Sequence, residues 1–239
     1  WEINEKYKIA IEQIVGKNHF LTGKINSLKY RFDIITLVHC LEHIENPRKY
    51  LVELKELMNK NGVVIIQVPN MKTSVYDVLI ADHYTHYTEE TLKNLIEDAG
   101  YEILELRVEW IKKEISLVAQ CKRKQEWEGH REKTKRNKIL IAQRMKQLKK
   151  ILKSINELEK EYYIFGSSIA ATWLGGAGNN KLKGFLDEDD SRVGSELLKK
   201  PIKHPSELKA KDRVIMPFDQ ELNKVIIDKF QYTGAWFKE

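Results

Sequence analysis

The sequence of 239 residues has few cysteines and no long apolar run, and each absence excludes a class of protein. Cys40 and Cys121 are too few and too far apart for a disulfide scaffold, and neither lies in a CxxC or Cys/His spacing, so no metal site is predicted. No apolar stretch approaches the roughly 20 residues of a membrane-spanning helix, and no secretory signal is recognisable. We therefore expect a cytoplasmic protein that does not enter a membrane.

The composition is that of a globular protein, with 42% apolar and 32% charged residues. The length allows one large domain or two modest ones, with enough chain to bury a core. Residue 1 is Trp and not Met, so we expect the sequence to begin inside a longer protein.

Positive charge is concentrated in one segment. Between Lys122 and Lys153 there are thirteen Lys or Arg and three Glu, a balance of +10, whereas the whole chain has a net charge of +6. Such a segment can contact nucleic acid. Trp127 is the single Phe, Trp or Tyr residue of this segment, and one aromatic ring gives little support for stacking with nucleic-acid bases. A solvated helix face linking two domains is therefore favoured, and a nucleic-acid partner is not expected.

Apolar periodicity in the first half alternates between strands and helices, which predicts an α/β fold with a largely parallel sheet. The two continuous apolar runs are expected to be strands buried on both faces. The last two strands are expected to form an antiparallel pair. The predicted strands are 19–21, 32–38, 63–68, 101–108 and 115–121, and the predicted helices are 4–15, 46–61 and 88–99.

Residues 122–160 are predicted to form a long helix that joins two domains. The apolar residues of this helix recur at steps of 4, 3, 4 and 3 and form one seam. The seam would pack either on a neighbouring domain or on a second subunit. In the second case the chain would form a homodimer through residues 139–158. A second, smaller Rossmann-like α/β domain is expected to follow, so the predicted domains are 1–121, 122–160 and 161–239. The seam consists of Ile141, Met145, Leu148, Leu152 and Ile155.

Three blocks of the first half, in this order and spacing, resemble class I S-adenosylmethionine (SAM)-dependent methyltransferases. The resemblance covers about residues 1–121 and implies a Rossmann-like methyltransferase sheet with SAM as the cofactor. The sheet would be incomplete at its N-terminal side, because the family's glycine-rich cofactor loop would lie upstream of Trp1. The blocks are FDII and VHCLEHI with Asn46–Pro47, then GVVIIQVPN at 62–70, then HYTHYTEETL at 83–92 followed by AGY at 99–101.

The resemblance also implies a set of cofactor-binding residues. An acidic residue at a strand end takes the ribose hydroxyls in this family, and Glu2 stands at that place, although an ordinary exposed Glu is the alternative. Many relatives carry an Asp at the position of Lys24. In this chain a backbone contact at Ile25 would take the place of the contact that this Asp makes with the cofactor. The other residues placed at the cofactor are Ile3, Val38, His39 and His43; for His43, packing on or capping the helix that begins at Asn46 is the alternative.

Methyl transfer requires alignment of the acceptor with the methyl group, and often the removal of a proton from the acceptor. Histidine suits proton removal because it titrates near neutral pH. His83 stands where relatives carry a histidine and is the first candidate for the catalytic base, and His86 is the second. Tyr84 in the same loop is a candidate for substrate contact. The alternative for each histidine is a structural brace of the loop.

The second half resembles the C-terminal domain of sugar C-methyltransferases, which act on nucleotide-linked deoxysugars. The resemblance implies an anion site at the turn of Gly166, Ser167 and Ser168, where a helix N-terminus offers backbone N–H groups, and a ribose contact at Asp187. The turn matches the GxGxxG fingerprint poorly, and a scaffold or dimerisation domain without a ligand is the alternative. The matching segments are 163–171, 182–194 and 200–208.

These observations predict a SAM-dependent methyltransferase that acts on a small polar acceptor, with a nucleotide-activated sugar as the first hypothesis. Two alternatives stay open at this point. One is a methyltransferase of a lipid or a nucleic acid, and the other is a non-catalytic binding or assembly module.

Overall fold

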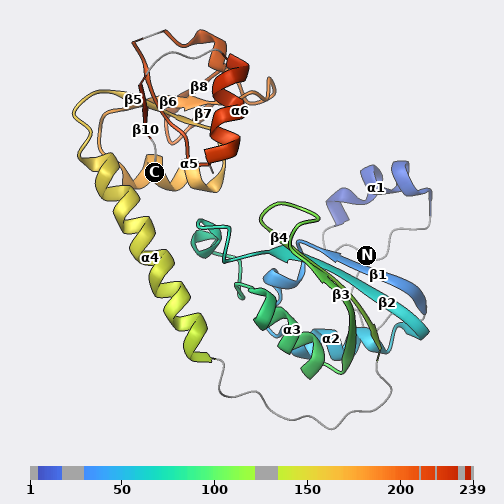
Figure 1. The fold of residues 1–239 in the computed structure, drawn as a ribbon. Coiled ribbons are helices and arrows are strands. Elements are labelled where there is room, and N and C mark those ends of the chain that lie inside the picture. Colours follow the sequence, from blue (N-terminus) through green and yellow to red (C-terminus); the bar gives the residue numbers. More distant parts are fainter. Residues whose placement is uncertain are drawn as a thin grey trace. The chain divides into compact units, whose positions relative to one another are not determined.

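The chain forms two compact units (Figure 1). The structure, a computed structural model, describes residues 5–17, 30–121, 134–209, 211–218, 220–230 and 235–237. One unit contains Trp1–Ser74 and Asp82–Glu132, and the other contains Val75–Ala81 and Lys133–Glu239. Each of the two units holds one mixed sheet with helices among its described residues, so the α/β class predicted from the sequence is confirmed.

The sheet of the first unit has four strands in the order β1-β2-β4-β3. Their bounds are β1 (Phe32–Val38), β2 (Met58–Pro69), β3 (Tyr101–Arg107) and β4 (Glu114–Cys121). β1 and β2 are parallel, whereas β4 is antiparallel to both β2 and β3. The predicted antiparallel pair is confirmed. The expectation of a largely parallel sheet is wrong for these four strands, because β4 inserts between β2 and β3.

β1 is more exposed than its apolar sequence predicts. Ile34 is 59% exposed and Val38 is 54% exposed, so this strand is not buried on both faces. The described helices α2 and α3 cover only one face of this sheet, and β1 lies at one edge of its described part. The predicted strand at 19–21 lies outside the described residues.

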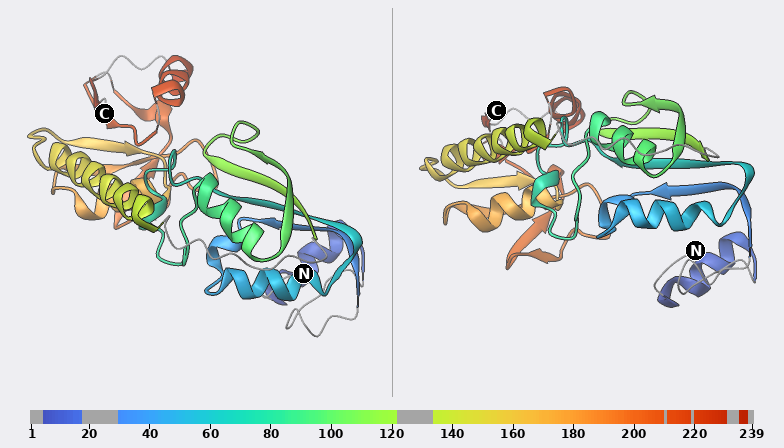
Figure 2. Two further views of the ribbon diagram at one scale, coloured as in Figure 1. Left: turned by 60° about the horizontal axis from the view of Figure 1, so that its bottom comes forward. Right: turned by 90° about the horizontal axis from the view of Figure 1, so that it is seen from below.

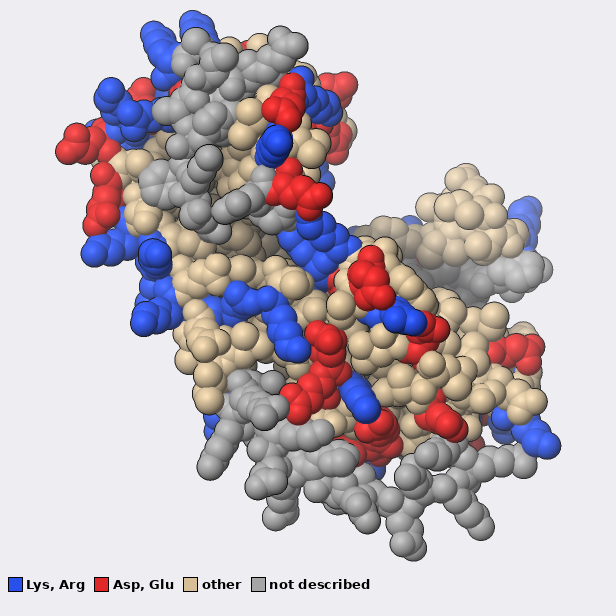
Figure 3. All heavy atoms as spheres, viewed as in Figure 1, with Lys and Arg blue, Asp and Glu red and all other residues tan. Residues whose placement is uncertain are grey.

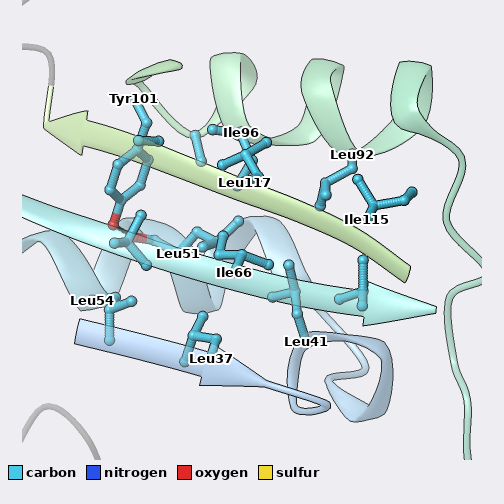
Figure 4. Packing of buried hydrophobic residues seen from close by; sticks show 14 of the residues in the cluster. Leu37, Leu41, Leu51, Leu54, Ile66, Leu92, Ile96, Tyr101, Ile115 and Leu117 are labelled. Carbon is cyan, nitrogen blue, oxygen red and sulfur yellow. Dashed lines mark hydrogen bonds between the residues drawn. The ribbon is translucent and has the colours of Figure 1, made fainter. Parts of the chain in front are cut away.

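Two helices cover one face of this sheet and form its core (Figure 4). Leu51 of α2 (Pro47–Lys55) and Ile96 of α3 (Glu89–Asp98) are fully buried against apolar side chains of β2 and β4. Full burial of side chains of this size contributes about 1.5–3 kcal/mol each. This core fixes the strands and therefore the loops at their ends.

α2 begins as predicted and ends earlier than predicted. The Asn46 side chain accepts a hydrogen bond from the Lys49 N–H at 3.1 Å and caps the helix. The helix does not continue to Gly62, because β2 begins at Met58, which pairs with Phe32. The register then shifts, so the segment between Met58 and Val63 forms an irregularity within β2.

Short 3-10 segments and a small helix complete the first unit, with bounds η1 (Glu5–Tyr7), α1 (Lys8–Val15) and η3 (Leu41–His43). Gly16 ends α1 with φ = 93°, as the sequence predicts. η3 follows β1 directly and carries residues of the candidate site.

The sheet of the second unit has six strands in the order β10-β9-β5-β6-β8-β7. Every described pairing is parallel except that of β7 with β8. The bounds are β5 (Tyr162–Phe165), β6 (Leu182–Leu186), β7 (Glu196–Leu197), β8 (Lys200–Lys203), β9 (Arg213–Ile215), β10 (Ala235–Phe237), α5 (Ile169–Ala177), α6 (Gln220–Phe230), η4 (Asp77–Leu79) and η6 (Pro205–Glu207).

Gly175 belongs to α5, close to the C-terminal end of this helix. A Cβ atom at this position would lie 2.6 Å from the Phe185 ring, so glycine allows α5 to approach β6 closely. Figure 2 shows this unit and the first one from two further sides.

α4 (Thr134–Asn156) packs on the second unit through the C-terminal half of its apolar seam. Ile155 of the seam and the nearby Ile151 belong to the core of this unit, and Leu148 of the seam is buried, whereas Ile141 and Met145 are exposed. Lys and Arg side chains lie along the exposed side of α4 (Figure 3), as expected for a solvated helix face. None of the described helices combines the length and the hydropathy needed to cross a bilayer.

The N-terminus of α3 carries a side-chain cap whose contribution to stability can be tested. Thr88 and Thr91 form a reciprocal capping box, in which the Thr88 hydroxyl accepts from the Thr91 N–H at 3.2 Å and the Thr91 hydroxyl accepts from the Thr88 N–H at 2.8 Å. Thr88→Ala removes this cap and is expected to destabilise the first unit by about 1–2 kcal/mol. Amide hydrogen exchange of α3 measures the loss, and Thr88→Ser is the control that keeps the hydroxyl. Equal protection in all three proteins would contradict the assigned cap.

Candidate functional site

The candidate site lies where the parallel strands β1 and β2 end. Parallel strands bring their carboxyl ends to one edge of a sheet, and ligands of open α/β sheets collect there. Residues 39–43 follow β1, and the loop of residues 82–88 precedes α3. The first residue of β4, Glu114, pairs with Pro69 at the end of β2 and so reaches the same edge.

His39 is held in a strained conformation between two carboxylates. Its φ angle is 47°, in the left-handed region that non-glycine residues seldom adopt, and its backbone N–H donates to the Gln67 carbonyl at 3.0 Å. Nδ1 lies 3.3 Å from Glu42 Oε1, and Nε2 lies 3.7 Å from Glu114 Oε1. Strain of this kind costs about 1–3 kcal/mol and is common at functional sites.

Glu42 is the most deeply buried charged residue of this edge, with 1% of its surface exposed. Oε1 faces His39, whereas Oε2 is buried and has no hydrogen-bond partner among the described residues. A buried carboxylate oxygen without a partner is costly. In folded proteins such an oxygen is usually completed by an ordered water, an ion or a ligand.

Several hydrogen bonds attach the 82–88 loop to the neighbouring segments. The Thr85 N–H donates to the Glu42 carbonyl at 3.3 Å, and the Tyr87 hydroxyl donates to the Leu41 carbonyl at 3.4 Å. The Met71 N–H donates to the Tyr87 carbonyl at 2.8 Å. Burial raises the pKa of Tyr87, so its hydroxyl stays protonated and remains a donor.

The loop brings three histidines together. The rings of His43 and His83 meet edge to face with centroids 4.8 Å apart, and His86 lies 6.1 Å from His83. His43 Nδ1 lies 3.1 Å from the Asp82 carbonyl oxygen and 3.3 Å from Asp82 Oδ2. Glu42, His43 and His83 each offer a ligand atom, and these atoms lie within 4.8 Å of one another. The two predicted catalytic histidines are therefore neighbours.

The other residues predicted for this site have different outcomes. For His43, the capping part of the alternative is wrong, because the Asn46 side chain caps α2, whereas packing on this helix stays a prediction. Tyr84 is largely exposed, and so is Val38 at the end of β1. The predicted cofactor residues Glu2, Ile3, Lys24 and Ile25 lie outside the described residues.

Two carboxylates of this site were not predicted from the sequence. Glu42 stands next to His43 in the quoted LEHI block, so its position carried a signal that was not used. Glu114 had no local signal, because only the antiparallel pairing of β4 with β2 brings it beside His39.

The second unit has a polar cluster after β5 and β6. Gly166 turns with φ = 85° at the end of β5. The Ser167 hydroxyl donates to Asp187 Oδ2 at 2.5 Å and accepts from Arg192 Nη1 at 2.6 Å. Ser168 caps α5 by accepting from the Ala171 N–H at 3.5 Å. The structure thus brings together all four residues predicted here and adds Arg192, which the sequence did not indicate.

These contacts hold Asp187 in its ionised form. Burial alone would raise the pKa of this carboxyl, but hydrogen bonds from Ser167 and the Asp189 N–H, together with Arg192, lower the pKa below its usual value. Asp187 is therefore already neutralised by Arg192, whose Nη1 lies 3.4 Å from Oδ2.

Comparison with known proteins supports the resemblance of the first half. Residues 4–106 match a family model described as a methyltransferase domain. A ubiquinone biosynthesis O-methyltransferase of Rickettsia canadensis is 26% identical over 107 residues, which are 38% of this chain and 45% of that protein. The mitochondrial ubiquinone biosynthesis O-methyltransferase of Schizosaccharomyces pombe is 23% identical over 122 residues, 44% of each chain. The chain thus spans less than half the length of these relatives.

Solved structures of methyltransferases resemble part of the chain more distantly. A SAM-dependent methyltransferase from Clostridium acetobutylicum has 14% identity and a TM-score of 0.40, with 49% of this chain and 70% of that chain covered. A 1,6-didemethyltoxoflavin-N1-methyltransferase from Burkholderia thailandensis, solved with S-adenosylhomocysteine, has 18% identity and a TM-score of 0.38, with 48% and 56% covered.

The environment of Asp187 predicts a defined dependence of stability on pH. The pKa of Asp187 is lower in the folded state than in the unfolded state, so the folded protein binds fewer protons. Ionised Asp187 therefore stabilises the folded state at neutral pH. This stabilisation is lost as the pH falls from about 5 through the folded pKa. Asp187→Asn is expected to lower the stability at pH 7 and to reduce its decline between pH 6 and pH 3. Urea unfolding at several pH values measures both effects. An Asp187→Asn protein with the same urea midpoint at pH 7 and the same decline of stability with pH as the wild type would contradict the role assigned to Asp187.

Proposed function

We propose that the first unit is part of a SAM-dependent methyltransferase in which a histidine removes a proton from a small-molecule acceptor. One observation carries this proposal: within the residues that match a methyltransferase domain, His43, His83 and His86 lie together where the parallel strands end. Histidines that can take up a proton at this edge of the sheet suit a substrate that loses a proton as it gains the methyl group.

The described residues fit a bound cofactor at the end of β1. Val38 presents an apolar side chain of which 54% is exposed, and the adjacent His39 imidazole is half exposed. These two residues would contact SAM, together with Glu2, Ile3, Lys24 and Ile25 as the resemblance implies. When bound, SAM supplies a methyl group on a positively charged sulfur. Glu42 and Glu114 orient the His39 ring from its two nitrogens, which keeps this wall of the site in one position.

His83 is the proposed proton acceptor. It is partly buried, its ring packs against that of His43, and the hydrogen bond from Thr85 to Glu42 attaches its loop to η3. A base held in this way is positioned before the acceptor arrives, which is the main contribution a protein can make to such a reaction. His86 is the second proton acceptor, and Tyr84 is exposed for contact with the acceptor.

Two lines of support concern the identity of the acceptor. The relatives named for O-methylation support an acceptor oxygen, whose proton must be removed. The second unit supports a nucleotide-linked acceptor such as an activated sugar, because the Gly166 turn leads into the N-terminus of α5 beside the Arg192 guanidinium. Backbone N–H groups and a guanidinium are the donors that phosphates prefer.

The homodimer predicted through α4 is also a proposal. Ile151 and Ile155 are already buried in the second unit, whereas Ile139, Ile141 and Met145 are exposed and would meet a second copy.

Replacement of His83 tests the proposed chemistry. His83→Asn is expected to lower kcat by about 10²–10⁴-fold, the usual contribution of a positioned base, and to leave SAM affinity nearly unchanged. His86→Asn is expected to cost less. Steady-state kinetics over a panel of small-molecule hydroxyl acceptors and nucleotide sugars, with calorimetry of SAM binding, measures these effects. His204→Asn in the second unit is the matched control.

Two results would separate the catalytic role of His83 from a structural one. If His83 only braces its loop, its replacement lowers the melting temperature and raises KM, whereas kcat changes little. A His83→Asn protein with the wild-type kcat would remove this residue from the reaction.

Replacement of Arg192 tests the proposed nucleotide contact. Arg192→Ala removes a guanidinium from the Gly166 turn and is expected to weaken the binding of a nucleoside diphosphate by about tenfold, as for a lost charge-assisted hydrogen bond. Calorimetric titration with UDP and dTDP measures the change. Lys181→Ala, an exposed cation just before β6, is the control. Equal affinities, or no binding to the wild type, would contradict a nucleotide site in this unit.

A further inference from the structure

We propose that the Phe218 side chain is a gate over the Gly166 turn, and that a nucleoside diphosphate binds at this turn only when the ring moves away. This gate rests on the nucleotide site proposed above and regulates the access to it. Two features of the second unit lead to it, the winding of the sheet and the position of the Phe218 ring.

The sheet of the second unit is wound in two directions from β5. The chain passes from β5 through α5 to β6 and then to β8 on one side, whereas β9 and β10 lie on the other side. Ile164 of β5 packs in the apolar cluster that contains Ala171 of α5. The next residue, Phe165, packs in the cluster that contains Ile226 of α6. Because successive side chains of a strand point to opposite faces, α5 and α6 cover opposite faces of the sheet.

A sheet of this kind has a preferred place for ligands. They bind in the crevice at the carboxyl ends of the two strands between which the winding changes direction, here β5 and β9. The Gly166 turn follows β5, and Phe218 lies in the short segment between β9 and α6. Both segments therefore border the crevice.

The Phe218 ring lies directly against the Gly166 turn. A Cβ atom at Gly166 would lie 3.2 Å from Phe218 Cζ and 3.9 Å from Ser168 Oγ. The ring thus borders both the turn and the residue that caps α5. In sites of this architecture, glycine lets the backbone of the first turn approach a pyrophosphate closely. Here the ring occupies the space beside that glycine, and an apolar ring offers no hydrogen bond to a phosphate.

The contacts of Phe218 hold its backbone more firmly than its side chain. The Phe218 carbonyl accepts a hydrogen bond from Asn223 Nδ2 at 3.1 Å, and Pro217 before it is buried. The ring itself is only partly buried, and it meets the Phe165 ring edge to face with centroids 6.1 Å apart. This contact favours the closed position, but it is a single aromatic pair. The gate therefore opens by rotation of the side chain and not by movement of the segment.

A closed gate lowers the affinity that is measured. The apparent Kd is the intrinsic Kd divided by the fraction of molecules in which the ring has moved away. Removal of the ring should therefore strengthen nucleotide binding, whereas the loss of a ring that contacts the ligand would weaken it. The direction of this change separates a gate from a binding residue.

Replacement of Phe218 in the full chain tests the gate. Phe218→Ala is expected to lower the Kd for UDP by about tenfold relative to the wild type, as for a crevice that is open in about one molecule in ten. Calorimetric titration with UDP measures the change. A Kd that is equal to or higher than that of the wild type would overturn the proposal.

The matched control is Phe230→Ala. Phe230 also packs against Phe165, with ring centroids 6.2 Å apart, but the atoms nearest to a Cβ at Gly166, apart from the adjoining residues, belong to Phe218 and Ser168. Phe230→Ala should leave the Kd for UDP unchanged. A similar gain of affinity in both variants would mean that a loosened core is the cause, and would overturn the gate.

A double replacement locates the gain of affinity. Arg192→Ala is expected to raise the Kd for UDP by about tenfold in the wild type and also in Phe218→Ala, because its guanidinium lies at the same turn. If Arg192→Ala has no effect once Phe218 has been replaced, UDP binds elsewhere in that variant and the gate is contradicted.

Nuclear magnetic resonance of Gly166 shows the ring movement directly. An aromatic ring shifts the signals of protons beside it, so the Gly166 signals of the wild type and of Phe218→Leu should differ without UDP. With saturating UDP they should coincide, because the ring has moved away. A difference that persists at saturation would overturn the proposal. Phe218→Leu keeps an apolar side chain, so this measurement decides if Phe218→Ala does not fold.

Failure of the gate can be distinguished from failure of the proposed nucleotide site. If neither the wild type nor Phe218→Ala binds UDP, the nucleotide site is contradicted, and the gate with it. If the wild type binds UDP in a manner that depends on Arg192, but Phe218→Ala binds no more tightly, the gate alone is contradicted. Neither result bears on methyl transfer at the first unit.

Discussion

The candidate site depends on how β2 pairs with its two neighbours. Because β1 is parallel to β2, the residue that follows β1 lies beside the end of β2, where the His39 N–H bonds to the Gln67 carbonyl. Because β4 is antiparallel to β2, its first residue, Glu114, lies at the same end. One strand therefore brings three segments of the chain to one edge. A register shift in either pairing would separate His39 from one of its carboxylates.

Local signals predicted most of the secondary structure, and non-local pairing accounts for the errors. Asn46 and Thr88 cap helices as their side-chain chemistry predicts, and Gly16 ends a helix as expected. The end of α2 was wrong because Met58 pairs with Phe32, a contact between residues distant in the sequence. The burial of β1 was wrong for a similar reason, since an apolar run does not reveal whether other elements cover both faces of the strand in the fold.

The same distinction applies to the two candidate sites. His83 and His86 were found because they stand in a block that resembles a family, and Ser167 was found from the turn that precedes α5. Glu114 was missed because it reaches its site through the pairing of β4, whose own sequence is unremarkable. Arg192 lies in the quoted segment 182–194, but its contact with Asp187 depends on how the chain turns after β6. Residues that contribute charge to a site from a distant element are thus the part that a single sequence conceals.

The two polar clusters balance their buried carboxylates in different ways. Asp187 accepts hydrogen bonds from Ser167 and has Arg192 beside it, so its charge is neutralised by the protein itself. A phosphate that approaches this cluster would compete with Asp187 for the Arg192 guanidinium. Glu42 is buried more deeply, yet only a half-exposed histidine faces one of its oxygens. The described residues therefore balance Asp187 with a guanidinium but leave one oxygen of Glu42 without a partner. The two clusters thus differ in the counter-charge that the protein itself supplies.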